Sequence, residues 1–265
     1  MNNNLIGVFD SGVGGLSVFK EIVKELPTQK YIYVSDNGYC PYGPRPREEV
    51  ISRAVSITDF LISKGAQIIV IACNTATAAA IEYLRSHYSI PFIGMEPAIK
   101  PAAIHSKSGV VGVLATKGTF KGELYLKTSN KYASNIEVLE QVGEGLVEIV
   151  ENDKIESDEA YSLLEKYLNP MIEKGADHIV LGCTHYPFLT DVIKGIVGDK
   201  MEIVNPAPAI AKRVAEILAQ ERLCVSDKGI NTFVTTGSNI ALVEKMVRDI
   251  APELANSAIF NTMVI

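Results

Sequence analysis

A cysteine at the end of an apolar run occurs twice in this chain, in nearly the same surroundings. The stretch Ile71–Thr75, centred on Cys73, returns as Leu181–His185, centred on Cys183, and a Gly-Ala pair begins eight residues before each cysteine. A continuous apolar run of this length is typical of a parallel strand that is buried on both faces. Each cysteine then follows the carboxyl end of a strand, where open α/β sheets bind ligands. A single cysteine in such a place usually fills space in a core. Two cysteines with matching flanking sequences favour a shared chemical role.

The residues that follow each cysteine predict the start of a helix. Asn74 or Thr75 is the expected N-cap of a helix over 76–84, and Thr184 is the expected N-cap of a helix over 188–196. A helix N-terminus carries about half a positive charge, and a cysteine placed there has a lowered pKa. We therefore expect both helix starts to favour the thiolate form of the cysteine before them.

Short apolar runs alternate with helical patterns along the chain, which predicts parallel sheets with helices on both faces. The strand expected at 5–10 has a counterpart at 109–116, about 105 positions later, close to the 110 positions that separate the two cysteines. This repeat favours an internal duplication. Further strands are expected before each cysteine and at 31–35, 90–97, 136–139, 201–204 and 231–236. Helices are expected at 16–26, 50–61, 146–150, 157–173, 210–218 and 240–250.

The repeat predicts an α/β fold of two pseudo-symmetric lobes, each a mostly parallel sheet flanked by helices, with the active site in the cleft between the lobes. Residues 1–97 begin the first lobe, and residues 98–207 form the second. The closing elements, residues 208–265, are too few for an independent domain. We therefore expect them to return to the first lobe and to make it discontinuous.

The composition is that of a soluble globular protein. The chain has 265 residues, 47% of them hydrophobic and 21% charged, which allows one large or two ordinary domains. A formal net charge of −6 and the lack of a basic run argue against a nucleic-acid partner. Residues 1–5 lack the features of a signal peptide, and no apolar stretch of about 18 residues is present to span a membrane. We therefore expect a cytoplasmic protein.

The four cysteines, Cys40, Cys73, Cys183 and Cys224, are then expected to be reduced thiols. The sequence contains no Cys-x-x-Cys pair. The only close pair of Cys and His is Cys183 with His185, whereas a zinc site needs three or four protein ligands. The sequence therefore predicts no metal site.

Two irregular segments are candidates for binding loops. The glycine-rich turn Ser11–Gly15 lies between a predicted strand and a predicted helix, where backbone N–H groups can approach an anion. It matches neither the dinucleotide pattern Gly-x-Gly-x-x-Gly nor a P-loop, so the choice is between an anion site and turn geometry alone. Residues 37–47 contain three prolines and two glycines, which exclude regular structure, and such loops often line sites.

Taken together, these stretches resemble the glutamate racemases of the aspartate/glutamate racemase family. The resemblance covers nearly the whole chain and departs from the family at Asn205-Pro206, where such proteins often have Asp-Ser. It implies a cofactor-independent, cytoplasmic homodimer that supplies D-glutamate for bacterial peptidoglycan. The matching stretches are Phe9–Leu16, Asp36 with Pro41-Tyr42-Gly43, Cys73–Ala76, Gly112–Thr116 and Gly182–Pro187.

The resemblance also implies a reaction with two acid–base groups. Racemisation removes the Cα proton from one face and returns a proton to the other, so one cysteine acts as thiolate base and the other as thiol acid. On this interpretation Cys73 takes the proton from D-glutamate with help from Asp10. Cys183 takes it from L-glutamate with help from His185.

The substrate of such a reaction carries two carboxylates, yet the motifs contain no Lys or Arg. Binding is therefore expected to rest on neutral donors and backbone N–H groups, and Asp10 is expected to face the ammonium group. Asp36 and Glu151 correspond to acidic site residues of the family, and Thr116 and Thr119 are the second lobe's counterpart of the Asp10 loop. The expected substrate-binding residues are Asp10, Ser11, Pro41, Tyr42, Gly43, Asn74, Thr75, Thr184 and His185.

Two other functions stay open at this point. An aspartate racemase or a related isomerase would use the same pair of cysteines on a shorter or different substrate. A ligand-binding protein could also be built from two α/β lobes around a cleft, although binding alone does not need paired cysteines at strand ends.

Overall fold

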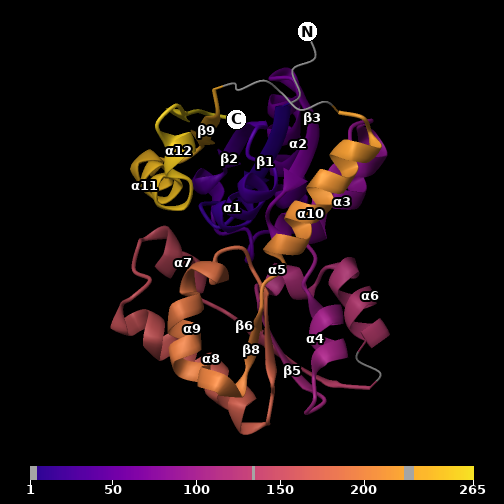
Figure 1. The fold of residues 1–265 in the computed structure, drawn as a ribbon, viewed down its shortest axis with the longest axis vertical. Helices are drawn as coiled ribbons and strands as arrows, with labels where there is room; N and C mark the ends of the chain where they lie inside the picture. Colours follow the sequence, from indigo (N-terminus) through magenta and orange to yellow (C-terminus); the bar gives the residue numbers. More distant parts are fainter. Residues whose placement is uncertain (1–4, 133–134, 224–229) are drawn as a thin grey trace.

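The computed structural model describes residues 5–132, 135–223 and 230–265, so Cys224 lies outside the described residues. Within these ranges the strands form one six-stranded and one four-stranded sheet, and all neighbouring strands are parallel. Helices flank both sheets (Figure 1). The predicted α/β class, with two mostly parallel sheets flanked by helices, is confirmed.

The six-stranded sheet has the order β10-β9-β2-β1-β3-β4. All six residues of β1 are buried, as its apolar sequence predicts. Its strands are β1 (Leu5–Asp10), β2 (Lys30–Ser35), β3 (Ala66–Ile71), β4 (Phe92–Gly94), β9 (Thr232–Thr235) and β10 (Ile259–Thr262). The helices between them in the chain are α1 (Leu16–Glu25), α2 (Arg47–Ser63), α3 (Asn74–His87), α11 (Ile240–Ile250) and α12 (Pro252–Ala255).

The four-stranded sheet has the order β6-β5-β7-β8. Its strands are β5 (Val110–Ala115), β6 (Glu137–Val142), β7 (His178–Gly182) and β8 (Glu202–Val204). The helices of this part of the chain are α4 (Ile99–His105), α5 (Lys117–Phe120), α6 (Glu123–Tyr132), α7 (Leu146–Glu151), α8 (Asp158–Glu173) and α9 (Thr190–Val197). Three short 3₁₀ turns within the described residues are η1 (Asn37–Tyr39), η2 (Tyr186–Leu189) and η3 (Gly198–Lys200).

The same strand order occurs in both sheets. The run β2-β1-β3-β4 of the first sheet corresponds to β6-β5-β7-β8 of the second, so β1 matches β5 and β3 matches β7. In each sheet the first strand in the chain lies between its second and third, which is the arrangement that opens a ligand crevice at the carboxyl ends of the strands. The two strands that precede the cysteines, β3 and β7, therefore occupy equivalent places beside two equivalent crevices.

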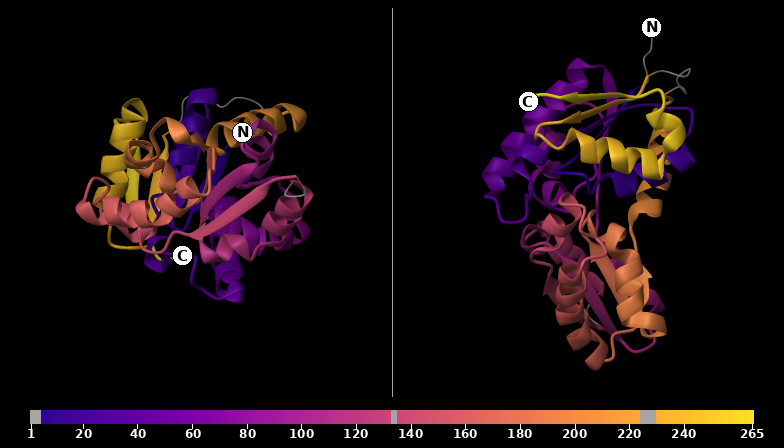
Figure 2. Two further views of the ribbon diagram at one scale, coloured as in Figure 1. Left: turned by 90° about the horizontal axis from the view of Figure 1, so that it is seen from below. Right: turned by 90° about the vertical axis from the view of Figure 1, so that its left-hand side faces the viewer.

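The two sheets lie in separate halves of the molecule. Figure 1 shows β1, β2, β3 and β9 in the upper half and β5, β6 and β8 in the lower half, and the right-hand view of Figure 2 shows the same division. The chain returns to the upper half through α10 (Ala207–Gln220), which packs against α1, and β9 then pairs with β2. The lobe boundaries after residues 97 and 207 stay a prediction.

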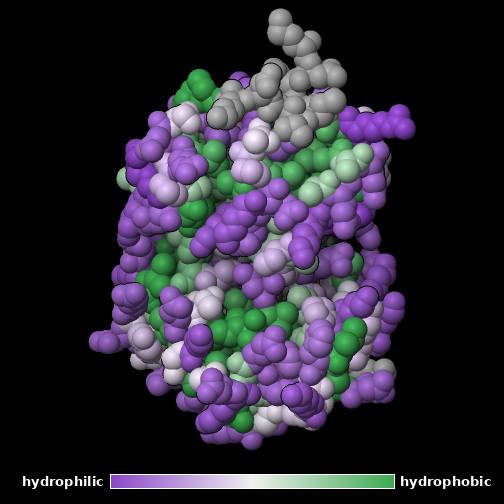
Figure 3. Space-filling model, in the orientation of Figure 1, coloured by the Kyte–Doolittle hydropathy of each residue, from purple (hydrophilic) through white to green (hydrophobic). Residues whose placement is uncertain are grey.

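The surface carries most of the polar side chains. On the face shown in Figure 3, hydrophilic residues dominate and hydrophobic ones lie in separate patches between them. Among the residues that the structure describes, no helix is both long enough and apolar enough to span a membrane.

The packing of Phe19 gives a prediction about stability. Its fully buried ring meets Tyr31, Tyr33 and Phe233 at centroid distances of 5.2, 5.9 and 5.4 Å, and so joins α1 to β2 and β9. Phe19→Ala should lower the free energy of unfolding by about 3–5 kcal/mol, because it leaves a cavity among rigid rings. Urea denaturation measures the change. Ile104→Ala, at a side chain that is 62% exposed, should change it by less than about 0.5 kcal/mol, and equal losses would contradict this account.

Candidate active site

Cys73 is itself the N-cap of α3, one residue before the cap that the sequence predicts. Its backbone is extended (φ −135°, ψ 121°), and its Sγ accepts the N–H of Ala76 at 3.4 Å. The sulfur thus replaces the hydroxyl or amide oxygen that usually caps a helix. Asn74 and Thr75 are freed from capping, and the hydroxyl of Ser11 lies 3.8 Å from the thiol.

Cys183 lies in a different local structure, and the predicted helix start at Thr184 is wrong. The chain forms a bend and a 3₁₀ turn after β7, and α9 begins only at Thr190. The hydroxyl of Thr184 caps no helix and instead donates to Oδ2 of Asp10 at 2.9 Å. His185 follows, and its Nδ1 lies 3.7 Å from Sγ of Cys183.

Asp10 joins the two halves of the molecule. The residue is fully buried, and its carboxylate accepts the N–H of Gly12 at 2.8 Å and the hydroxyl of Thr184 from the other sheet. Burial raises the pKa of Asp10 to about 6, and the nearby His185 limits the rise. Asp10 therefore exchanges a proton close to neutral pH.

His185 bridges a cysteine and a carboxylate. Its Nε2 lies 2.7 Å from Oε1 of Glu151, on the side of the ring opposite Cys183. Burial lowers the pKa of His185, but the hydrogen bonds with Cys183, Cys40 and Glu151 outweigh burial and raise the pKa well above its ordinary value. These partners therefore favour the protonated form of the ring. Glu151, at the end of α7, is held in turn by the N–H of Val13 at 2.7 Å.

Burial changes the expected state of Cys73. The pKa of its thiol is raised by burial and by the charge of Asp10, and the opposing N–H of Ala76 does not compensate. The expectation that the helix start favours a thiolate is thus wrong for Cys73, because desolvation of the charged form outweighs one backbone donor. Cys73 is a thiol in this arrangement of the site, which suits a proton donor.

Both cysteines line one small cavity between the halves. The space that admits the centre of a water molecule is about 10 Å³, room for about one water. A larger hollow of about 810 Å³ adjoins it. The cavity has no room for an amino acid, so the groups that line it must move apart before one can bind. The cavity is lined by Ser11, Pro41, Tyr42, Gly43, Cys73, Asn74, Thr75, Thr116, Val147, Cys183, Thr184 and His185.

The structure brings together most of the predicted binding residues and adds Val147, an apolar side chain of α7 with no sequence signal beyond helix periodicity. The side-chain amide of Asn74 is buried, and neither its nitrogen nor its oxygen has a hydrogen-bond partner among the described residues. A buried amide without partners costs free energy, so Asn74 is suited to bind a ligand. Thr75 and Thr116 face each other from the two halves, with 2.8 Å between their hydroxyl oxygens.

Asp36, Thr119, Glu151 and Asp10 do not line the cavity. Asp36 lies behind Tyr42, whose hydroxyl donates to it, and also forms a buried ion pair with Arg53 at 2.7 Å. The carboxylate of Asp36 therefore fixes the loop that carries Tyr42 and does not contact a substrate in the cavity. Thr119 lies behind Thr116 in the same way, with 2.9 Å between the two hydroxyl oxygens.

Residues 6–214 match the model of the Asp/Glu/hydantoin racemase family. The chain belongs to this family. It is 44% identical to a glutamate racemase of Herpetosiphon aurantiacus over 89% of this chain and 94% of the relative.

Two solved glutamate racemases are similar in structure to this member of the family. The enzyme of Escherichia coli, solved with L-glutamate and the activator UDP-MurNAc-ala, has a TM-score of 0.83 and 31% identity, over 98% of this chain and 97% of that one. The enzyme of Francisella tularensis, solved with D-glutamate, has a TM-score of 0.80 and 26% identity, over 100% of this chain and 98% of that one. Similarity therefore extends over the entire two-sheet architecture.

The pKa of Asp10 leads to a prediction for stability against pH. Because the folded-state pKa of about 6 exceeds the ordinary value of 3.8, the folded protein binds the proton more tightly. The stabilisation is complete below about pH 3.8 and is lost as the pH rises through 6. From pH 4 to 7, wild type should lose up to about 3 kcal/mol of unfolding free energy relative to Asp10→Asn. Chemical denaturation at several pH values measures this difference.

The matched control for that experiment is Glu165→Gln, at an exposed carboxylate on α8. It should follow the pH dependence of wild type. Parallel curves for wild type and Asp10→Asn would show that Asp10 does not carry the raised pKa.

Proposed function

We propose that this protein interconverts L- and D-glutamate by proton transfer to and from Cys73 and Cys183, without a cofactor. The observation that carries the proposal is the placement of the two cysteines. They follow equivalent strands of two sheets and line one cavity. A carbon held between them would have one sulfur on each face, which is what inversion at Cα requires.

The two cysteines have different partners, which suggests how protons are distributed. In the L-to-D direction Cys183 removes the Cα proton beside the His185 imidazole, and the Cys73 thiol donates a proton to the opposite face. In the reverse direction Cys73 is the base and Cys183 the acid. Each turnover leaves one proton more on one sulfur and one fewer on the other. Asp10, whose pKa is raised to about 6, and His185, whose pKa is raised above its ordinary value, assist the return to the starting state.

The substrate would be held by neutral donors. Ser11, Thr75 and Thr184 offer hydroxyls, and Asn74 offers an amide with no other partner among the described residues. The buried Asp10 carboxylate suits the ammonium group, and the His185 imidazolium adds positive charge near a substrate carboxylate. Closing the halves on the ligand excludes water and strengthens each of these contacts.

The relatives favour glutamate over aspartate. Two of the solved relatives with more than 25% identity hold glutamate: the Escherichia coli enzyme holds L-glutamate and the Francisella tularensis enzyme holds D-glutamate. An aspartate racemase homologue of Pyrococcus horikoshii, at 21% identity and a TM-score of 0.50, shares only the fold. By the same family relationship we infer a cytoplasmic homodimer that supplies D-glutamate for peptidoglycan, with lobes bounded after residues 97 and 207.

Isotope exchange tests the proposal. Wild type incubated in heavy water with L-glutamate, and separately with D-glutamate, should place deuterium at Cα of both enantiomers. Cys73→Ala and Cys183→Ala should each lower racemisation by at least about 100-fold, since each removes one acid–base group. Cys73→Ala should exchange only L-glutamate, and Cys183→Ala only D-glutamate. Mass spectrometry after chiral separation measures both quantities.

Parallel assays with aspartate decide between the two substrates. Racemisation by the double variant, or exchange of the same enantiomer by both single variants, would overturn the two-cysteine reaction. Tight binding of glutamate by wild type without exchange would favour the ligand-binding protein instead.

A further inference from the structure

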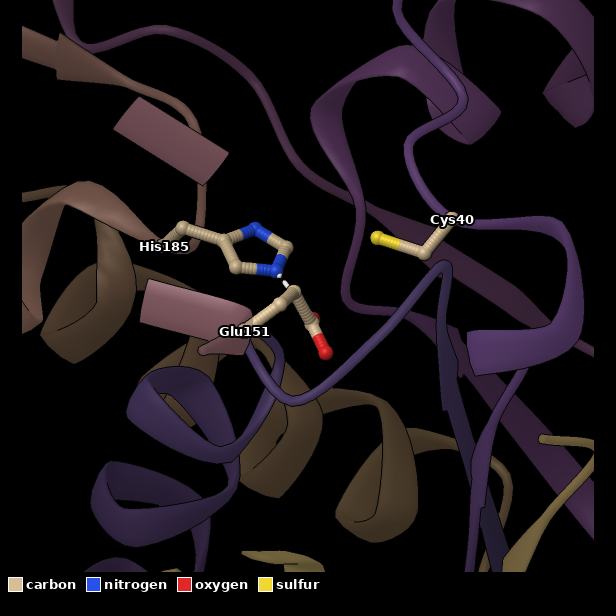
Figure 4. A group of neighbouring side chains, drawn as sticks. All are labelled: Cys40, Glu151 and His185. Carbon is tan, nitrogen blue, oxygen red and sulfur yellow. Dashed lines mark hydrogen bonds and ion pairs between the residues drawn. The ribbon is translucent and has the colours of Figure 1, made fainter. Parts of the chain in front are cut away.

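Cys40 has no part in the proposed reaction, yet its thiol lies beside the proton-handling residues. It follows η1 in the proline-rich loop, whereas Glu151 ends α7 and His185 follows β7. A sulfur, a carboxylate oxygen and a ring nitrogen of these three residues all lie within 4.8 Å of one another. Figure 4 shows Cys40 and His185 pointing toward each other, with Glu151 bonded to the ring.

Thiolate, imidazole and carboxylate are the ligands that Zn²⁺ takes in proteins. Three protein ligands with a fourth position left to water are typical of zinc sites that are not purely structural. Tetrahedral Zn²⁺ separates such ligand atoms by roughly 3.3–3.6 Å, given bond lengths of about 2.0–2.3 Å. Side-chain adjustments of about 1 Å would therefore convert the present cluster into a metal site.

The surroundings of the cluster permit an ion to arrive and to be held. Cys40 and Glu151 are partly exposed, whereas His185 is buried. The carboxylate of Glu151 is already fixed by the N–H of Val13 and by the side-chain amide of Asn37, at 2.7 and 2.6 Å. Burial raises the pKa of the Cys40 thiol to about 12, so a bound ion must displace that proton to solvent.

We propose that Cys40, Glu151 and His185 form a binding site for a thiophilic divalent cation such as Zn²⁺, and that the bound ion inhibits turnover. Binding releases the thiol proton of Cys40 and any proton on the ligating nitrogen of His185. The imidazole can then no longer assist Cys183. The inhibition, though not the binding, rests on the proposed racemase function.

Neither Cys40 nor Glu151 lines the substrate cavity. The ion would therefore block proton handling without filling the space for the amino acid. We expect Zn²⁺ to lower kcat in both directions of the reaction, because His185 would be held by the ion. Chelation by EDTA should restore activity.

Co²⁺ binding provides a test that does not depend on activity. Co²⁺ accepts the same ligands, and a Co²⁺–thiolate bond gives a near-ultraviolet charge-transfer absorption. Titration of wild type should produce this band, and Zn²⁺ should displace it. Cys40→Ser should lack the band. Measured against its own activity without metal, it should need a Zn²⁺ concentration more than about 10–100-fold higher for inhibition, since even loss of a residue that only orients a ligand has an effect of that size. Cys224→Ser should behave as wild type.

The outcomes separate the two proposals. A Co²⁺–thiolate band that persists in Cys40→Ser, or unchanged inhibition of that variant by Zn²⁺, would mean that the metal binds elsewhere, for example at Cys73 or Cys183, and would overturn the site. A band that depends on Cys40 in a protein without racemase activity would uphold the site and reject the proposed function.

Discussion

The buried carboxylate of Asp10 is the group on which the arrangement of the site depends. A carboxylate removed from water is costly unless hydrogen bonds replace the lost hydration. The turn after β1 supplies the N–H of Gly12, and the turn after β7 supplies the hydroxyl of Thr184. Neither half could bury this charge equally well alone. The same bond that lowers the cost of burying Asp10 therefore fixes the position of the turn after β7, and with it Cys183 and His185.

The glycine-rich turn after β1 exists because the second half of the molecule approaches it closely. A Cβ atom at Gly12 would overlap the carboxylate of Glu151, and one at Gly14 would overlap the ring of His185. The sequence left open whether these glycines serve an anion or only a turn. The structure gives a third reason for glycine at these positions. Without a Cβ atom they leave room for the side chains of Glu151 and His185, which pack against the turn after β1.

Strands such as β3 and β7 could be predicted because a buried parallel strand needs a continuous apolar run, and the paired cysteines followed from their matching positions. Features that depend on distant neighbours could not be predicted. The exposed edge strand β10 has no apolar pattern. The turn after Cys183 is set by the bond from Thr184 to Asp10, 174 positions away. Cys40 meets His185 only because a loop of one half covers a strand end of the other.

The contacts that close the cavity are made by groups proposed to hold the substrate. Thr75 bonds Thr116 across the halves, and Thr184 bonds Asp10. Such bonds contribute about 0.5–1.5 kcal/mol each, and about 1.5–3 where a charge takes part. Breaking these two bonds therefore costs a few kcal/mol, which a ligand can offset by offering the freed groups new partners. An amino acid can provide such partners, because its ammonium group can bind Asp10 and its carboxylates can accept from the hydroxyls. The hydrogen bonds that close the cavity therefore favour ligands that carry both kinds of group.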